Sequence, residues 1–224
     1  MASELDDTEG MTQFVSFSDQ VGWRIEPIPR AKTRTPDLKV SVAEYEFVVE
    51  VKTLMPNKEE RAANERSAKG QIGTRGCTPG KRVKGVINDA NEQIKAVAGE
   101  SPAMLVIFNA TGTSLHTKPY SVMTAMQGLD VVDVLVSSDP AIRPLISNET
   151  RSGPGRAMAP AWNSSTSAVA VIQEDAEGSP ILLVFHNQHA AKKLEPDAIR
   201  SPRVHQFSLP PDAKNSVESE WMKV

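Results

Sequence analysis

The chain has 224 residues, 39% of them hydrophobic, a formal net charge of −3 and a single cysteine. This length can bury a sizeable core, and the net acidity argues against a protein that coats nucleic acid with its whole surface. The one cysteine, Cys77, excludes an intramolecular disulfide and a cysteine-based zinc site, and no apolar run is long enough to cross a bilayer. The acidic start, Met1 to Gly10, lacks the pattern of a signal peptide, so we expect a cytoplasmic protein with no membrane partner.

In the first half of the chain, apolar residues recur both at helical spacing and in the every-second-residue alternation of strands. Apolar residues at helical spacing predict helices, and alternation with a period of two predicts strands. The polar, basic and glycine-rich stretch 56–80 fits either a mobile loop or a short helix over 58–68 followed by a loop. The predicted helices are 11–21 and 82–98, and the predicted strands are 23–28, 38–42, 45–54 and 103–109.

The second half is also α/β, with weaker patterns. They predict a helix over 120–127, strands over 131–137, 167–173 and 181–186, and a loop over 151–163, with the last two strands paired through the turn at 174–180. Helices alternating with strands predict an α/β fold, a mixed central β-sheet flanked by helices. We expect one domain over 11–209, with its core in 11–110 and a C-terminal elaboration in 111–209, between a disordered acidic tail over 1–10 and an irregular tail over 210–224.

Acidic and basic side chains share one face of the hairpin predicted over 38–54. If its turn is centred on Ala43 and Glu44, then Asp37 faces Glu50 across the two antiparallel strands. Such opposed residues have Cβ atoms roughly 4.5–5.5 Å apart. Lys52 lies two residues beyond Glu50 and therefore emerges from the same face. The sequence thus places two carboxylates and an ammonium together.

This arrangement has two interpretations. Two close carboxylates repel each other unless a proton or a cation lies between them, and a hard divalent ion such as Mg²⁺ or Mn²⁺ suits their oxygens. A bound cation can polarise a phosphodiester, while an adjacent lysine orients the nucleophile or stabilises charge on phosphorus. The alternative is a ladder of ion pairs formed by Asp37, Lys52 and Glu50 on a solvated strand face.

The order of residues in this segment favours the metal-binding interpretation. Thr35-Pro36-Asp37, a hydrophobic strand, and then Glu50-Val51-Lys52 resemble the signature of the PD-(D/E)XK nuclease superfamily. The resemblance spans roughly residues 12–110 and implies a restriction-endonuclease-like core. It implies that Asp37 and Glu50 are metal ligands with catalytic roles, that the Val51 carbonyl is a further ligand, and that Lys52 is the catalytic lysine.

Two further residues follow from the same resemblance. Ala90-Asn91-Glu92-Gln93 is similar to a glutamine motif on a helix, so Gln93 is expected to approach the site, although a partly exposed helical glutamine is the simpler alternative. Many members carry an acidic metal ligand on the first helix. Here Glu9 is our choice for that ligand, ahead of Glu4 and Asp19.

Basic residues concentrate around this segment. Eight lysines and arginines but only three glutamates lie between Lys58 and Lys84, and a second basic stretch surrounds Asp37. Such side chains can follow a phosphate backbone, with an ordinary solvated loop as the alternative. The expected DNA contacts are Arg34, Arg66, Lys69, Arg75, Lys81 and Arg82.

The sequence therefore predicts a divalent-metal-dependent deoxyribonuclease, with Mg²⁺ or Mn²⁺ as cofactor and DNA as partner. One alternative is a catalytically inactive, nucleic-acid-binding protein of the same fold. Another is an α/β interaction protein whose acid–lysine face is merely solvated. The sequence leaves open whether the protein is a homodimer.

Overall fold

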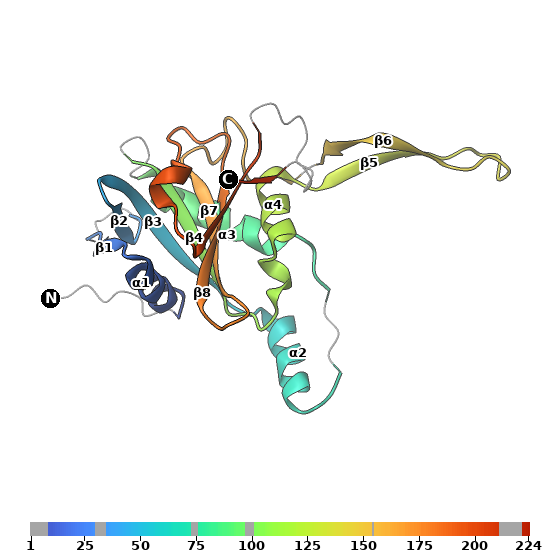
Figure 1. Cartoon of the computed structure of the whole chain (residues 1–224). Helices are drawn as coiled ribbons and strands as arrows, with labels where there is room; N and C mark the ends of the chain where they lie inside the picture. Colours follow the sequence, from blue (N-terminus) through green and yellow to red (C-terminus); the bar gives the residue numbers. More distant parts are fainter. Residues whose placement is uncertain (1–8, 30–34, 73–75, 97–100, 154, 211–220) are drawn as a thin grey trace.

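A computed structural model of the chain describes residues 9–29, 35–72, 76–96, 101–153, 155–210 and 221–224, and its elements are drawn in Figure 1. The α-helices are α1 (Glu9–Val21), α2 (Lys58–Ala68), α3 (Lys81–Lys95) and α4 (Pro119–Gln127), and the short 3₁₀ helices are η1 (Ser114–His116) and η2 (Pro196–Ile199). The strands are β1 (Arg24–Pro27), β2 (Leu38–Val42), β3 (Tyr45–Leu54), β4 (Ala103–Asn109), β5 (Asp130–Leu135), β6 (Leu145–Ser152), β7 (Ala168–Glu174), β8 (Pro180–His186), β9 (Val204–Ser208) and β10 (Met222–Lys223).

The centre of the molecule is a mixed sheet of eight strands in the order β1-β2-β3-β4-β7-β8-β9-β10. The first three strands form an antiparallel meander, and β4 lies parallel to both of its neighbours, β3 and β7. β8 returns antiparallel to β7, β9 runs parallel to β8, and β10 closes the far edge antiparallel to β9. The α/β class with a mixed central sheet, predicted from the sequence, is confirmed.

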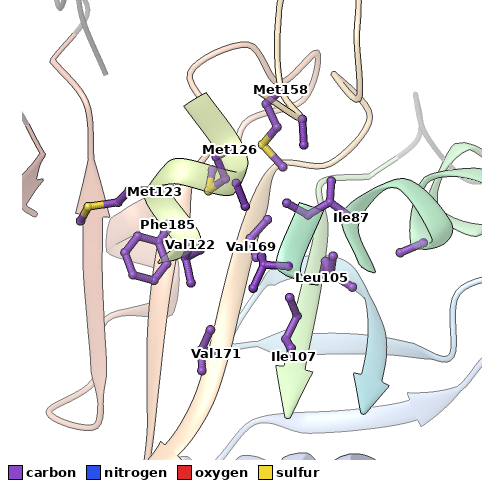
Figure 2. Packing of buried hydrophobic residues seen from close by; sticks show 14 of the residues in the cluster. Ile87, Leu105, Ile107, Val122, Met123, Met126, Met158, Val169, Val171 and Phe185 are labelled. Carbon is purple, nitrogen blue, oxygen red and sulfur yellow. The ribbon is translucent and has the colours of Figure 1, made fainter. Parts of the chain in front are cut away.

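Each face of the sheet has its own hydrophobic cluster. α1 covers one face, where Phe14 and Phe17 pack with Trp23 and with Phe47 of β3. α3 and α4 cover the other face, and Figure 2 shows side chains of these helices meeting those of β4, β7 and β8. In β3 the two sets alternate: Phe47, Val49 and Val51 face α1, whereas Val48 and Leu54 face α3. Glu50 and Lys52 are in phase with Val48 and Leu54, so they emerge on the α3 side.

A two-stranded hairpin projects from this body. β5 and β6 pair antiparallel with each other and form a sheet of their own (Figure 1). We call β5, β6 and the turn that joins them the arm. Most of the arm's aliphatic side chains are exposed, among them Leu135, Val136 and Leu145, at 71%, 74% and 67%.

Most of the predicted elements are found with small changes in their ends. The strands predicted over 38–54 and 103–109 have the predicted bounds, and stretch 58–68 is the helix α2 rather than a loop. The loop expected over 151–163 begins too early, because β6 extends to Ser152. The tail expected over 210–224 is wrong at its end: Trp221 is buried against Phe185, and Met222–Lys223 pairs with β9. The tail expected over 1–10 lies mostly outside the described residues.

The part of the chain that the structure describes contains no helix long and apolar enough to cross a membrane.

Candidate functional site

The hairpin β2–β3 has the register expected from its sequence. Val42 pairs with Tyr45 and Leu38 with Val49, so the next position along brings Asp37 opposite Glu50. The backbone N–H of Asp37 donates to the Val49 carbonyl at 3.1 Å, which holds Asp37 at the beginning of β2. The two carboxylates therefore lie on adjacent strands, with Cβ atoms roughly 4.5–5.5 Å apart.

The side chain of Asp37 accepts a backbone hydrogen bond that a longer β2 would otherwise accept. Its Oδ2 accepts a hydrogen bond of 2.9 Å from the backbone N–H of Val51, a donor that β2 would otherwise satisfy if it continued toward Pro36. In a strand the N–H and C=O of one residue point to the same side, so the Val51 carbonyl also points toward the side where Asp37 lies. The Asp37 carboxylate and the Val51 carbonyl therefore lie on the same side of β3, beside the beginning of β2.

Glu50 is the most unusual group of the site because it is a fully buried carboxylate, with 0% of its side chain exposed. Its Oε1 lies 2.5 Å from Lys52 Nζ. Among the described residues, however, neither oxygen has a hydrogen-bond partner of good geometry. Burial and the neighbouring charge of Asp37 raise the pKa of Glu50 to about 7, and Lys52 offsets only part of this. A buried, poorly satisfied carboxylate is costly and calls for a cation.

The burial of Glu50 argues against a ladder of ion pairs that is solvated along the whole face. A solvated ion-pair ladder does exist at the turn end of the hairpin, where Lys39 Nζ lies 2.8 Å from Glu46 Oε2 and both side chains are almost half exposed. Glu50 is completely enclosed, so it is not a rung of that ladder. β3 is an interior strand of the sheet, and Glu50 lies on the face that α3 covers.

Lys52 connects the hairpin to α3. Its Nζ donates to Gln93 Oε1 at 2.8 Å and also contacts Glu50, while 31% of its side chain remains exposed. The amphipathic pattern of α3 fixes this approach, since Val83, Ile87 and Ile94 are buried on the sheet side and Gln93 lies beside them. Gln93 thus contacts Lys52, on the side of the sheet where the resemblance to a helical glutamine motif places it, and its amide oxygen holds the ammonium.

The donors suit a small hard cation in part. Asp37, Glu50 and the Val51 carbonyl offer oxygen ligands only, which is the preference of Mg²⁺ and Mn²⁺. Among the described residues, no group of three acidic, histidine or cysteine side chains is arranged to hold a metal ion. An ion at this position would therefore keep several water ligands, which Mg²⁺ commonly does.

The structure does not bring Glu9 to this group. Glu9 is exposed at the beginning of α1, on the opposite face of the sheet from Glu50. The next residue, Gly10, donates its N–H to Thr53 Oγ1 at 3.2 Å. Glu9 instead borders a separate cavity of about 370 Å³, together with Phe108 and Asn109.

The basic residues named as DNA contacts divide into three groups. Arg66 and Lys69 are exposed at the end of α2, and Lys81 is exposed at the beginning of α3. Arg82 is engaged within the protein: its guanidinium contacts Glu60 Oε2 and the Met55 carbonyl, both at 2.7 Å. Arg34 and Arg75 lie outside the described residues.

Sequence reasoning did not foresee the buried network around Glu60. Asn57 caps α2 by accepting the Glu60 N–H at 2.9 Å, and the Glu60 carboxylate accepts the Asn57 N–H at 2.7 Å. The same carboxylate contacts Arg82 and lies 2.6 Å from His116 Nε2. The spacing Asn57-x-x-Glu60 is a capping-box signal that could have located α2, but nothing local in the sequence indicates the partners from α3 and η1.

Comparison with protein-family models, with curated proteins and with solved structures finds no match to this chain.

Proposed function

We propose that the protein is a divalent-metal-dependent nuclease that hydrolyses DNA phosphodiester bonds and has a restriction-endonuclease-like core. The observation that carries the proposal is Glu50, a fully buried carboxylate opposite Asp37 and 2.5 Å from Lys52. A buried carboxylate whose pKa is raised by burial and by a second carboxylate is typical of functional sites.

The order of the elements supports the same core. α1 precedes the meander β1–β2–β3, and α3 then leads to β4, which pairs parallel with β3. The carboxylates lie on β3 and at the beginning of β2, and Gln93 comes from the helix between β3 and β4. This is the placement that the PD-(D/E)XK resemblance implies for these residues.

Each side chain has a distinct role in the proposed reaction. Asp37, Glu50 and the Val51 carbonyl would hold the cation, which supplies Lewis acidity to the scissile phosphate. Lys52, fixed between Glu50 and Gln93, orients the attacking water and stabilises the negative charge that develops on the phosphoryl oxygens. Burial strengthens the interaction of Lys52 with the neighbouring carboxylates.

A cleavage assay tests the proposal. Plasmid DNA is incubated with the purified protein and Mg²⁺ or Mn²⁺, and the variant Lys52→Ala is compared with Lys192→Ala, which removes an exposed lysine in the loop after β8. Loss of one transition-state contact of this kind typically costs roughly 10²–10³ in rate. We expect that loss for Lys52→Ala and parental cleavage for Lys192→Ala. Equal cleavage by both variants, or DNA binding with no cleavage by the parent protein, would contradict the nuclease.

A further inference from the structure

The single cysteine lies beside a histidine and a carboxylate, away from the proposed metal site. Cys77 Sγ is 3.5 Å from His116 Nδ1, and His116 Nε2 is 2.6 Å from Glu60 Oε1. His116 and Glu60 are buried, whereas Cys77 is half-exposed and open to small reagents. The three residues come from the segment before α3, from η1 and from α2, so the fold brings together groups that are distant in the sequence.

The position of the protons follows from the partners of Glu60. Burial raises the pKa of the Glu60 carboxyl, but the Asn57 N–H, Arg82 and His116 outweigh it and hold the pKa below its usual value. An ionised carboxylate only accepts hydrogen bonds, so the hydrogen between it and the imidazole is on His116 Nε2. Nδ1 is then the ring nitrogen that faces the thiol and can take its proton.

Thiol, imidazole and carboxylate thus form an ordered series of nucleophile, base and orienting group. The arrangement does not suit a chelated metal ion, because the thiol and the carboxylate lie at opposite nitrogens of one ring and cannot share an ion with it. We propose that Cys77 is a modification site, a nucleophilic thiol assisted by His116 that reacts with low-mass disulfides.

The reaction is thiol–disulfide exchange. The proton of the Cys77 thiol passes to His116 Nδ1, and the thiolate attacks one sulfur of the disulfide reagent. The reagent's S–S bond breaks as the new bond to Cys77 forms, one half of the reagent leaves as its thiolate, and His116 returns its proton to that thiolate or to solvent. Cys77 is oxidised to the disulfide level, one half of the reagent is reduced to a thiol, and no further oxidant is needed.

The experiment uses the aromatic disulfide 5,5′-dithiobis(2-nitrobenzoic acid) on the intact protein. The chain has one cysteine, so the thiolate released reports this site alone. At pH 6.5 we expect the native protein to react at least tenfold faster than the same protein unfolded in urea. His116→Asn should abolish the advantage, and Glu60→Gln should move the midpoint of the rate–pH profile upward.

The control is His189→Asn, which removes a partly exposed histidine far along the chain and should leave the rate unchanged. A native rate at or below the unfolded rate overturns the proposal, as does a folded His116→Asn variant that reacts like the parent. If that variant fails to fold, which circular dichroism reveals, the comparison of native with unfolded parent decides alone.

The arm carries a second, independent inference. Val134 pairs with Ile146, and the adjacent pair is Leu135 with Leu145. Adjacent pairs point to opposite faces of a hairpin, so both faces of the outer arm are apolar. All four side chains are at least 50% exposed. A lone two-stranded hairpin is marginally stable in water, so such an arm needs a covering surface.

We infer that the arm is covered by the arm of a second copy of the chain, about a two-fold axis. Its exposed aliphatic side chains lie along both strands and the turn, from 42% at Val132 to 74% at Val136, and contiguous exposed apolar surface of this kind marks an interaction site. Segment 129–152 contains four acidic and two basic residues, a net charge of −2, which does not suit nucleic acid or an anionic membrane. Because each copy offers the same surface, a symmetric pairing satisfies both arms at once.

Sedimentation velocity over a range of protein concentrations tests this inference. We expect a dimer for the parent, a monomer for the double variant Leu135→Glu/Leu145→Glu, and a dimer for Ile72→Glu, which charges a residue that is 92% exposed elsewhere on the surface. A parent that is monomeric at every concentration overturns the inference. So does a double variant that remains dimeric, or a control that dissociates equally.

Discussion

Replacing Glu50 by glutamine should stabilise the metal-free protein at alkaline pH. The carboxyl ionises near its ordinary value of 4.5 in the unfolded chain but at about 7 in the folded chain, because burial and Asp37 oppose its charge. Between these two values the folded state binds more protons than the unfolded state, so stability falls as pH rises from about 4.5 to 7. The loss amounts to about 3 kcal/mol at pH 8 and is small at pH 5.

The assay is urea unfolding of the parent and Glu50→Gln in EDTA at pH 5 and at pH 8. Glutamine has the shape of the protonated carboxyl but cannot ionise, so the variant should match the parent at pH 5 and exceed its free energy of unfolding by up to about 3 kcal/mol at pH 8. Glu177→Gln removes an exposed carboxylate from the turn between β7 and β8 and should show no such pH dependence.

Adding Mn²⁺ should reverse the order of the two proteins at pH 8. A cation that binds the folded parent stabilises it by mass action, whereas the variant has lost a charged ligand and gains little. A Glu50→Gln variant that is less stable than the parent in EDTA at pH 8 would show that the ionised Glu50 does not destabilise the fold. A difference between the two proteins that is the same at both pH values would show the same.

Three further predictions concern other parts of the molecule. Asp37→Asn should lower Mn²⁺ affinity in isothermal titration calorimetry, because it removes a negative ligand; an unchanged affinity would count against the site. Arg66→Ala/Lys69→Ala should weaken DNA binding and reduce the slope of log affinity against log salt by about 2, measured by fluorescence anisotropy, with near-normal turnover at saturating DNA. Trp221→Ala should lower the free energy of unfolding by about 3–5 kcal/mol in urea, because Trp221 packs edge-on against Phe185; an effect below 1 kcal/mol would show that the end of the chain adds little.

The hairpin and the placement of its charged residues were predictable because they depend on local rules. The alternation of apolar and polar residues fixed which side of β3 faces α3, and an even turn length fixed Asp37 opposite Glu50. The pattern could not predict burial: Glu50 occupies a polar position in the alternation of β3, yet its side chain is fully buried on the side that α3 covers. The same limit applies to Glu60, whose partners Arg82 and His116 come from separate elements.

The elements that sequence reasoning missed also depend on distant contacts. β9 consists of Val-His-Gln-Phe-Ser, a weak pattern that becomes a strand because Val204 and Phe207 pair beside β8. β6 contains polar residues through most of its length and is specified by its pairing with β5. In such segments tertiary pairing, rather than the residues' own preference, decides the conformation.

The position of β4 has a consequence for how the protein folds. Both of its neighbours are parallel to it, and each is brought in by a long excursion of the chain: Val48 pairs with Ala103, and Met104 pairs with Ala168. Closing such loops costs entropy before any pairing compensates for it, which slows folding. The β2–β3 hairpin needs no such closure, so we expect Asp37 and Glu50 to meet early. Their mutual repulsion would then be present in the first structured species, and Lys52 would gain its contact with Gln93 only when α3 docks.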